Sequence, residues 1–266
     1  MLDSGFYNMD CMEGMKQFPD KFFDLAIVDP PYGNAINPST NNLRGGAADW
    51  KQRGRFGGWF SNYDLSDGRR QPTGNSAENS AGGSPTTICR TGGSWSKKYQ
   101  KGGIFEHDHD IRTWDIAPDA AYFDELGRVS KNQIIWGGNY FDLPPTRCFL
   151  VWQKLTISEK FSMAMCEYAW TSFNDNAKLF ACAPQGTAKE KRFHPTQKPI
   201  ALYTWILNLY AKPGYKILDT HVGSASSLIA CYRAGLEYWG FETHKGYYQK
   251  ATERLETEKA QMRMTF

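Results

Sequence analysis

Positions 29 to 32 read Asp-Pro-Pro-Tyr, a combination of a carboxylate, a rigid turn and an aromatic ring. They directly follow FFDLAIV, an apolar run typical of a buried strand. Asp29 offers a carboxylate and Pro30 a backbone carbonyl, two acceptors that together could hold both hydrogens of an amine. Because proline fixes φ, Pro30 and Pro31 would keep these acceptors in place before a substrate arrives. Tyr32 adds an aromatic face on which a planar ring can stack.

This pattern is suited to the exocyclic amine of a nucleobase. Such a nitrogen is conjugated with the ring and is a poor nucleophile, so acceptors on both of its hydrogens would favour a pyramidal form with an available lone pair. A base inside a duplex cannot reach a methyl donor, and Tyr32 could stack on a base that has been turned out. The alternative interpretation is a rigid turn at a strand end with a packed tyrosine.

A second group of residues lies in KILDTHVGSASSLIACYRAGLEYWGFE, residues 216 to 242. Asp219 closes a predicted strand, Gly223 and Ser224 begin a turn into a helix, and Glu242 ends the next strand about twenty residues later. In this arrangement the second acid accepts hydrogen bonds from ribose hydroxyls. The turn lacks the GxGxxG pattern of pyrophosphate sites, so S-adenosylmethionine, which has a ribose but no phosphate, is the expected ligand. An ordinary β-α-β turn is the alternative.

The predicted secondary structure around these residues alternates between strand and helix. A β-α-β opening covers residues 5 to 28, and another covers 215 to 242. Between them we expect a helix at 119–130, strands at 132–138, 148–152 and 162–170, and a helix at 201–210. A charged helix at 247–262 follows. This order predicts an α/β fold with a Rossmann-like, doubly wound, mostly parallel sheet in one domain, residues 1–266.

Residues 37–103 interrupt this pattern with a long stretch rich in Gly, Asn and Ser. It contains ten basic and four acidic residues, a net charge of +6, whereas the whole chain carries +3. Aromatic residues are interleaved with the basic ones, which is the composition of a flexible clamp for nucleic acid. We therefore expect an inserted loop that could bind DNA. A solvated loop whose charges only keep it soluble is the alternative.

Both ends of the chain resemble the amino-type DNA methyltransferases, which modify N6 of adenine or N4 of cytosine. The resemblance rests on residues 7–33, which contain DPPY, and on residues 191–242, which contain HPTQKP and the DTHVGSA turn. DPPY comes before the cofactor turn, as in the permuted β class of this family. The resemblance implies a catalytic role for Asp29, Pro30, Pro31 and Tyr32.

The same resemblance implies the contacts of the cofactor. The residues that match cofactor-binding positions are Asp10, Thr196, Lys198, Asp219, Gly223, Ser224 and Glu242. Asp10 matches the contact to the adenine ring, and Glu242 matches the acid on the ribose. Thr196 and Lys198 are candidate partners of the cofactor's carboxylate. His194, in the same segment, is expected to have a structural role.

The cofactor turn departs from the family pattern DPFxGSG at three positions. Thr220 and His221 replace the usual Pro and Phe, and Ala225 replaces the second Gly. Loss of the Phe removes an apolar contact with the cofactor's adenine. Ala225 adds a methyl group where the backbone should approach closely.

The function that the resemblance implies is transfer of a methyl group from S-adenosylmethionine to adenine N6 in DNA. Asp29 at the first motif position favours adenine, because the cytosine enzymes more often carry Ser there. The alternatives are a cytosine-N4 enzyme, a methyltransferase acting on RNA or on a protein glutamine, and a DNA-binding relic with an impaired cofactor turn. DNA recognition is expected in residues 156–192, whose basic residues and the flanking Lys154 could meet phosphates.

Composition limits the remaining possibilities. Hydrophobic residues make up 41% of the chain, so it should fold. No apolar run is long enough to cross a membrane and no basic leader precedes one, so we expect a cytoplasmic protein. Six scattered cysteines without a CxxC pair argue against a zinc site or a disulfide framework. The sequence leaves open whether the protein dimerises and whether a restriction partner exists.

Overall fold

The computed structural model describes residues 1–33, 115–160, 164–184 and 192–261. The chain divides into one unit formed by Met1–Leu43 with Phe105–Phe266 and a second unit, Arg44–Ile104. The second unit and the predicted basic insertion at 37–103 lie outside the described residues, so the proposed DNA clamp stays a prediction.

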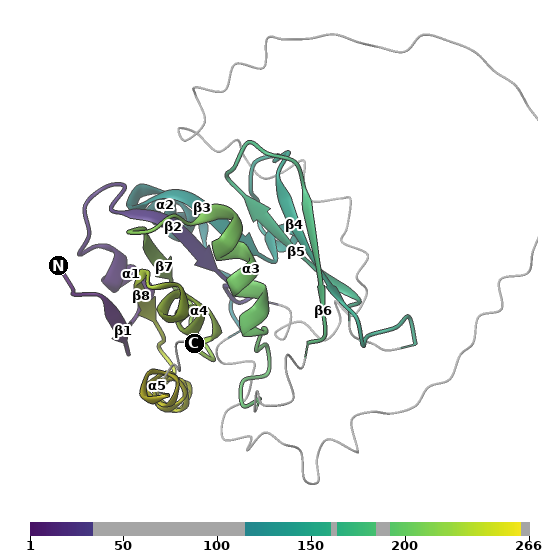
Figure 1. Ribbon diagram of the computed structural model, residues 1–266. Helices are drawn as coiled ribbons and strands as arrows, with labels where there is room; N and C mark the ends of the chain where they lie inside the picture. Colours follow the sequence, from purple (N-terminus) through teal and green to yellow (C-terminus); the bar gives the residue numbers. More distant parts are fainter. Residues whose placement is uncertain (34–114, 161–163, 185–191, 262–266) are drawn as a thin grey trace, which may run out of the picture. The chain divides into compact units, whose positions relative to one another are not determined.

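The described residues form one eight-stranded sheet with helices packed against it (Figure 1). The strands are β1 Gly5–Tyr7, β2 Phe23–Val28, β3 Ser130–Trp136, β4 Phe149–Lys154, β5 Cys166–Thr171, β6 Lys178–Cys182, β7 Lys216–Asp219 and β8 Glu237–Phe241. The helices are α1 Cys11–Met15, α2 Ala120–Val129, α3 Ile200–Tyr210, α4 Ser226–Ala234 and α5 Lys245–Ala260, and η4 Gly138–Tyr140 is a short 3-10 helix.

The strand order is β1-β8-β7-β2-β3-β5-β4-β6. The first five strands of this order run parallel to one another, and β4 is also parallel to β6. Only β5 runs antiparallel to its neighbours, β3 and β4. The predicted α/β fold with a mostly parallel sheet is therefore confirmed for this part of the chain.

Helices cover both faces of the sheet because the central strands are apolar on both sides. On one face Leu25 and Ile27 of β2 belong to a core shared with α3, α4 and α5. On the other face Ala26 and Val28 of the same strand pack in a core with α1 and α2. Alternate residues of one strand thus supply two separate cores, as the period of two in a strand requires.

The direction of winding reverses between β7 and β2. From β7 the chain passes through α4 to β8 on one side, whereas from β2 it leads through the described α2 to β3 on the other. Open parallel sheets bind ligands at such a reversal, just outside the carboxyl ends of the strands. The carboxyl ends of β7 and β2 carry Asp219 and Asp29, so the fold places two predicted site residues at this reversal.

The sequence pattern missed one strand. β6, Lys178–Cys182, lies at the edge of the sheet, and its residues alternate between half-buried and exposed, with none fully buried. The run KLFAC is short and follows a polar stretch, so its periodicity is too brief to indicate a strand. As a result, the candidate recognition interval 156–192 contributes both β5 and β6 to the sheet in addition to its loops.

Candidate active site

Four predicted acids lie beyond the carboxyl ends of four adjacent parallel strands. Asp10 caps α1 after β1, Glu242 follows β8, Asp219 ends β7, and Asp29 follows β2. The strands stand in the order β1-β8-β7-β2, so these residues, far apart in sequence, share one edge of the sheet. The fold therefore brings the DPPY turn and the cofactor turn side by side.

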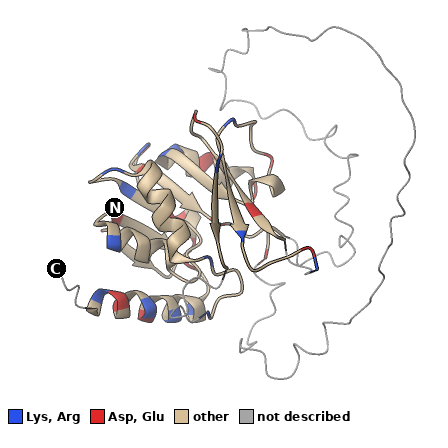
Figure 2. Cartoon of the chain, turned by 45° about the vertical axis from the view of Figure 1, so that its right-hand side comes forward, with Lys and Arg blue, Asp and Glu red and all other residues tan. Residues whose placement is uncertain are grey.

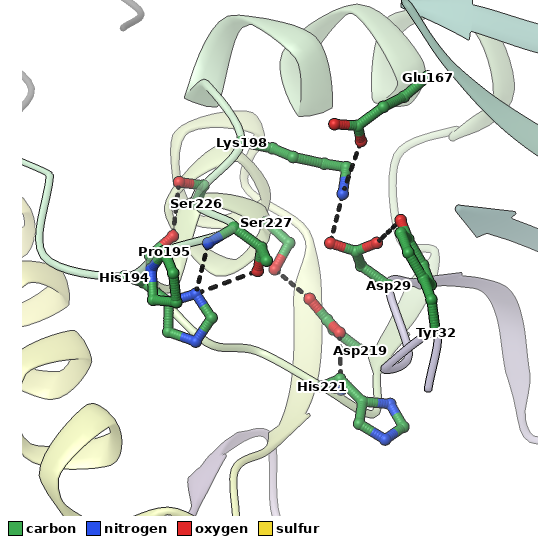
Figure 3. A network of polar contacts seen from close by, with 12 residues as sticks. Asp29, Tyr32, Glu167, His194, Pro195, Lys198, Asp219, His221, Ser226 and Ser227 are labelled. Carbon is green, nitrogen blue, oxygen red and sulfur yellow. Dashed lines mark hydrogen bonds and ion pairs between the residues drawn. The ribbon is translucent and has the colours of Figure 1, made fainter. Parts of the chain in front are cut away.

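Both carboxylate oxygens of Asp29 accept hydrogen bonds inside the protein (Figure 3). The Tyr32 hydroxyl donates to Oδ1 at 2.7 Å. The Lys198 ammonium donates to Oδ2 and forms an ion pair with it. The side chain of Asp29 is only 14% exposed, so its orientation is set by these two donors rather than by water.

Lys198 contacts a second carboxylate, that of Glu167 on β5. Its Nζ lies 3.1 Å from Glu167 Oε2 and 5.4 Å from the centre of the Trp136 ring. Burial alone would lower the pKa of Lys198, but the Asp29 and Glu167 carboxylates hold it above its usual value. The structure therefore places Lys198 as an ammonium ion on Asp29, whereas the sequence resemblance had suggested the carboxylate of the cofactor.

Tyr32 packs against the strand-to-helix turn at Gly137 and Tyr140. Gly137 adopts φ +69°, and a Cβ there would lie 2.2 Å from the Tyr32 ring. The ring of Tyr140 stacks on that of Tyr32, with centroids 4.7 Å apart and planes at 19°. Burial and the neighbouring Asp29 raise the pKa of Tyr32, so its hydroxyl keeps its proton and acts as a donor.

Asp219 is buried at the end of β7, on the other side of the winding reversal. Its Oδ2 accepts from the Ser227 hydroxyl, and its Oδ1 accepts from the His221 backbone N–H at 3.0 Å. Burial raises the pKa of Asp219 to about 7, with Asp29 and Glu242 adding to the shift, against the two hydrogen bonds that lower it. This carboxylate is poised to gain or lose a proton near neutral pH.

The cofactor turn and the end of β8 are tied together by Glu242. Its Oε2 accepts from the Gly223 N–H at 2.9 Å, and its Oε1 accepts from the His244 N–H at 2.8 Å. Each carboxylate oxygen can accept a further bond, so ribose hydroxyls could still be held. Burial raises the pKa of Glu242. Ser224 uses its hydroxyl on Ser226 at 3.1 Å, within the turn.

The three departures of the turn have defined environments. Thr220 Oγ1 lies 2.6 Å from the Tyr122 hydroxyl and 2.9 Å from His221 Nδ1, which links all three side chains. Burial lowers the pKa of His221 to about 4, so its ring is neutral at physiological pH. Ala225 caps α4 at φ +61°, where a non-glycine residue is strained. Its methyl group is fully buried in the core.

The remaining predicted residues are also engaged in local structure. Asp10 Oδ1 accepts from the N–H groups of Met12 and Glu13 at the start of α1. Thr196 Oγ1 lies 3.2 Å from His194 Nδ1, and the His194 ring packs on Tyr247 and beside Gly223. Burial lowers the pKa of His194 to about 3, which agrees with a structural role.

Glu167 was not predicted from the sequence, whereas Gly137 and Tyr140 lie in WGGNY, residues 136–140, which the sequence favours as a structural turn with lining of the target pocket as the alternative. Glu167 stands in an alternating strand where a charge usually faces solvent, so nothing local distinguishes it. In the structure Gly137 and Tyr140 both contact Tyr32 of the DPPY turn. Only the sheet, which sets the end of β3 beside the end of β2, brings them to Tyr32.

Comparisons with known proteins agree with this geometry. A family model described as "DNA methylase", for enzymes acting on N6 or N4, matches residues 123–253. The type II methyltransferase M.HindIII of Haemophilus influenzae is 22% identical over 298 residues, covering 95% of both chains. The chain is similar to the amino-type DNA methyltransferases, which methylate adenine N6 or cytosine N4 in DNA.

Two further proteins are similar to this chain, one over a short segment and one at low sequence identity. M.HpaI of Haemophilus parainfluenzae is 36% identical over 70 residues, which are 26% of this chain and 22% of the relative. The structure of the cytosine-N4-specific PvuII DNA methyltransferase superimposes with a TM-score of 0.51 at 10% identity. It covers 97% of this chain and 91% of the PvuII enzyme, so the two share a fold.

The described residues were also compared for surface charge, metal-binding groups and membrane-spanning helices. Basic and acidic side chains are mixed along α5 instead of forming a one-sided basic face (Figure 2). No group of three metal-binding side chains occurs in the residues that the structure describes. Among the same residues, no helix is long and apolar enough to cross a membrane.

Lys154, a predicted phosphate contact, is not available for that role in the structure. Its side chain is only 9% exposed, and its Nζ lies 2.5 Å from Glu167 Oε1. The pattern of basic residues could not reveal this, because β4 buries the lysine beside a carboxylate of the neighbouring strand.

Proposed function

We propose that this protein transfers a methyl group from S-adenosylmethionine to N6 of adenine in DNA. The observation that carries the proposal is the position of Asp29 and Tyr32 beside Asp219, on the two sides of the sheet's winding reversal. A base held by the DPPY turn would there meet a cofactor held by the DTHVGSA turn.

The target amine would be held by two fixed acceptors. One oxygen of Asp29 and the carbonyl of Pro30 accept its two hydrogens, which frees the nitrogen lone pair for attack. Neither acceptor has to reorganise, because Tyr32 and Lys198 already orient the carboxylate. The base would stack on Tyr32 in the place that the Tyr140 ring takes, and Tyr140, at 44% exposed, is free to give way.

The residues of the cofactor turn fit S-adenosylmethionine. When bound, it supplies the electrophilic methyl group. Gly223, at φ +55°, brings the backbone to the reversal without a side chain, and Glu242 beside it keeps lone pairs for the ribose hydroxyls. Asp219 offers a negative charge to the cofactor's ammonium and sulfonium groups. Asp10 and Thr196 lie at the exposed rim, where they are proposed to contact the adenine ring and the carboxylate.

Adenine is favoured over cytosine by Asp29, since the cytosine enzymes more often carry Ser at this position. A cytosine-N4 enzyme is the second candidate, and the likeness to the PvuII enzyme concerns the fold alone. DNA recognition is proposed for residues 156–192 and for the insertion at 37–103. Because M.HindIII is a type II methyltransferase, a restriction-modification system is the proposed setting.

Product analysis tests the proposed base. Unmethylated DNA is incubated with the protein and S-adenosylmethionine labelled in its methyl group, then digested to nucleosides and separated. We expect the label in N6-methyladenine. Label in N4-methylcytosine would overturn the choice of base, and a protein that binds DNA without transferring label would support a relic. RNA incubated in parallel should remain unlabelled.

The pH dependence of cofactor binding tests Asp219. Its pKa of about 7 is above the usual range for a carboxyl, so below pH 7 the protonated form prevails in the free protein. The positive groups of the cofactor favour the ionised form, so affinity should rise with pH and level off above 7. The expected slope below pH 7 is about tenfold per unit.

Isothermal titration between pH 5.5 and 8.5 measures this slope. His194 and His221, with pKa values of about 3 and 4, stay neutral across that range and should not contribute. Glu242 is shifted in the same direction, so Asp219→Asn serves as the control that isolates Asp219. A slope that persists in this variant would exclude Asp219 as its source.

A further inference from the structure

Four side chains of alternating charge connect the β4–β5 pair to the proposed catalytic carboxylate. Lys154 Nζ lies 2.5 Å from Glu167 Oε1, and Glu167 Oε2 lies 3.1 Å from Lys198 Nζ. Lys198 in turn forms an ion pair with Asp29 Oδ2. Figure 3 shows Lys198 between the two carboxylates, with the Tyr32 hydroxyl on the far oxygen of Asp29.

The burial of these groups shows that the chain of charges is more than a surface feature. The side chains of Lys198, Lys154, Asp29 and Glu167 are 3%, 9%, 14% and 24% exposed. Lysines are rarely buried so deeply unless they are paired, because desolvating the ammonium is costly. Burial would raise the pKa of Glu167, but Lys198 and Lys154 hold it below its usual value. Glu167 and Lys198, the two groups in the middle of the chain, are therefore charged near neutral pH.

The first three residues of this series of charges lie on separate parts of the fold. Lys154 ends β4, Glu167 lies on β5, and Lys198 precedes the Pro199 cap of α3. Glu167 pairs with Trp152 across the β4–β5 ladder, so its backbone is fixed by the sheet. Glu167, which is fixed by the sheet, thus holds the Lys198 ammonium toward the DPPY turn, although Lys198 itself lies in a loop.

We propose that Lys198 and Glu167 are positioning residues for Asp29. Lys198 fixes the rotation of the Asp29 carboxylate, so that its remaining lone pairs point toward the target amine. Glu167, neutralised on its other side by Lys154, keeps the Lys198 ammonium on Asp29 and away from the cofactor's carboxylate. This inference rests on the proposed function, in which Asp29 holds the amine.

Kinetics of Glu167→Gln test the positioning role. The amide keeps the shape but removes the charge that aims Lys198, and a displacement of about 1 Å at Asp29 costs up to about 100-fold in rate. We expect kcat for methyl transfer to fall about 30-fold to 100-fold, with KM for S-adenosylmethionine changed less than twofold. The matched control is Glu256→Gln, an exposed carboxylate on α5 paired with Lys259, which should leave kcat unchanged.

Ligand binding, which needs no turnover, separates Lys198 from a role on the cofactor. S-adenosylhomocysteine has the amino-acid carboxylate, and 5′-methylthioadenosine lacks it. If Lys198 holds Asp29, Lys198→Gln should bind both ligands within about threefold of the wild type. A selective loss of S-adenosylhomocysteine affinity by tenfold or more would assign Lys198 to the cofactor and overturn the inference.

Two further variants keep the test decisive if a single change unfolds the protein. Lys154→Met acts one step farther from Asp29 and should lower kcat less than Glu167→Gln does. Lys198→Arg retains the charge and should recover part of the activity that Lys198→Gln loses. Unchanged kcat in folded Glu167→Gln would refute the inference while the wild type still methylates DNA. A wild type without methyl transfer would instead refute the proposed function.

Discussion

Replacing Asp29 by asparagine should reduce methyl transfer to DNA by about 10²-fold to 10³-fold, the usual cost of removing one preorganised polar contact from a reacting group. The amide would place an N–H₂ group where Tyr32 and the amine need an acceptor, and Lys198 would lose one of its two anionic partners. Cofactor binding should change little, because Asp219, Gly223 and Glu242 lie at or beyond the ends of other strands, β7 and β8. Single-turnover transfer and titration with S-adenosylhomocysteine measure the two effects separately.

Asp24→Asn is the matched control for this change. Asp24 lies on the same strand β2 and is also ion-paired, with Lys131 at 2.6 Å, but it is at the opposite end of the strand. It should keep transfer within about twofold of the wild type. Equal losses in both variants would mean that Asp29 acts only through stability, and the assignment of the DPPY turn would fail.

The second large effect is expected from Gly137→Ala. A Cβ at this position would lie 2.2 Å from the Tyr32 ring, so the ring must move and its 2.7 Å hydrogen bond to Asp29 must break. Transfer should fall about 100-fold, as a displacement of about 1 Å near a reacting group can produce. The positive φ adds about 1 kcal/mol of strain to the folded state. Transfer kinetics and a thermal melt record both consequences.

Gly214→Ala separates strain from collision. Gly214 has a comparable φ of +82°, but no atom lies within 4 Å of the place that its Cβ would take. The strain should therefore lower the stability of this variant by roughly 1 kcal/mol, and methyl transfer should be fully retained. If the two alanine variants lose the same activity, Gly137 does not support Tyr32 and the second prediction is wrong.

The elements of the fold could be predicted wherever a long apolar period was present. β2, α2, α3 and the β7-α4-β8 unit all lie where the pattern placed them, within a few residues. β6 was missed because an edge strand buries few side chains and so has a weak pattern. The antiparallel direction of β5 also could not be inferred, since pairing direction depends on which strand lies beside it.

The residue types of the proposed site could be read from the sequence, whereas their contacts could not. DPPY and the paired acids Asp219 and Glu242 indicated a base and a cofactor, because their motifs are compact and follow strands. Lys198 was associated with the cofactor through its motif, whereas in the structure it lies on Asp29 and Glu167. The two carboxylates are separated from it by 169 and 31 positions in sequence, so no local spacing could signal the contact.

Local sequence indicated the chemical groups and their order along the chain: first a turn proposed to hold an amine, then, near the other end, a unit proposed to hold a ribose. It could do so because each motif is held together by neighbouring residues. The tertiary structure alone decided which groups meet. Parallel pairing in the order β1-β8-β7-β2 gathers the four acids at one edge, and antiparallel β5 brings Glu167 to Lys198. Such contacts depend on the burial of two apolar faces of one sheet, which no single segment encodes.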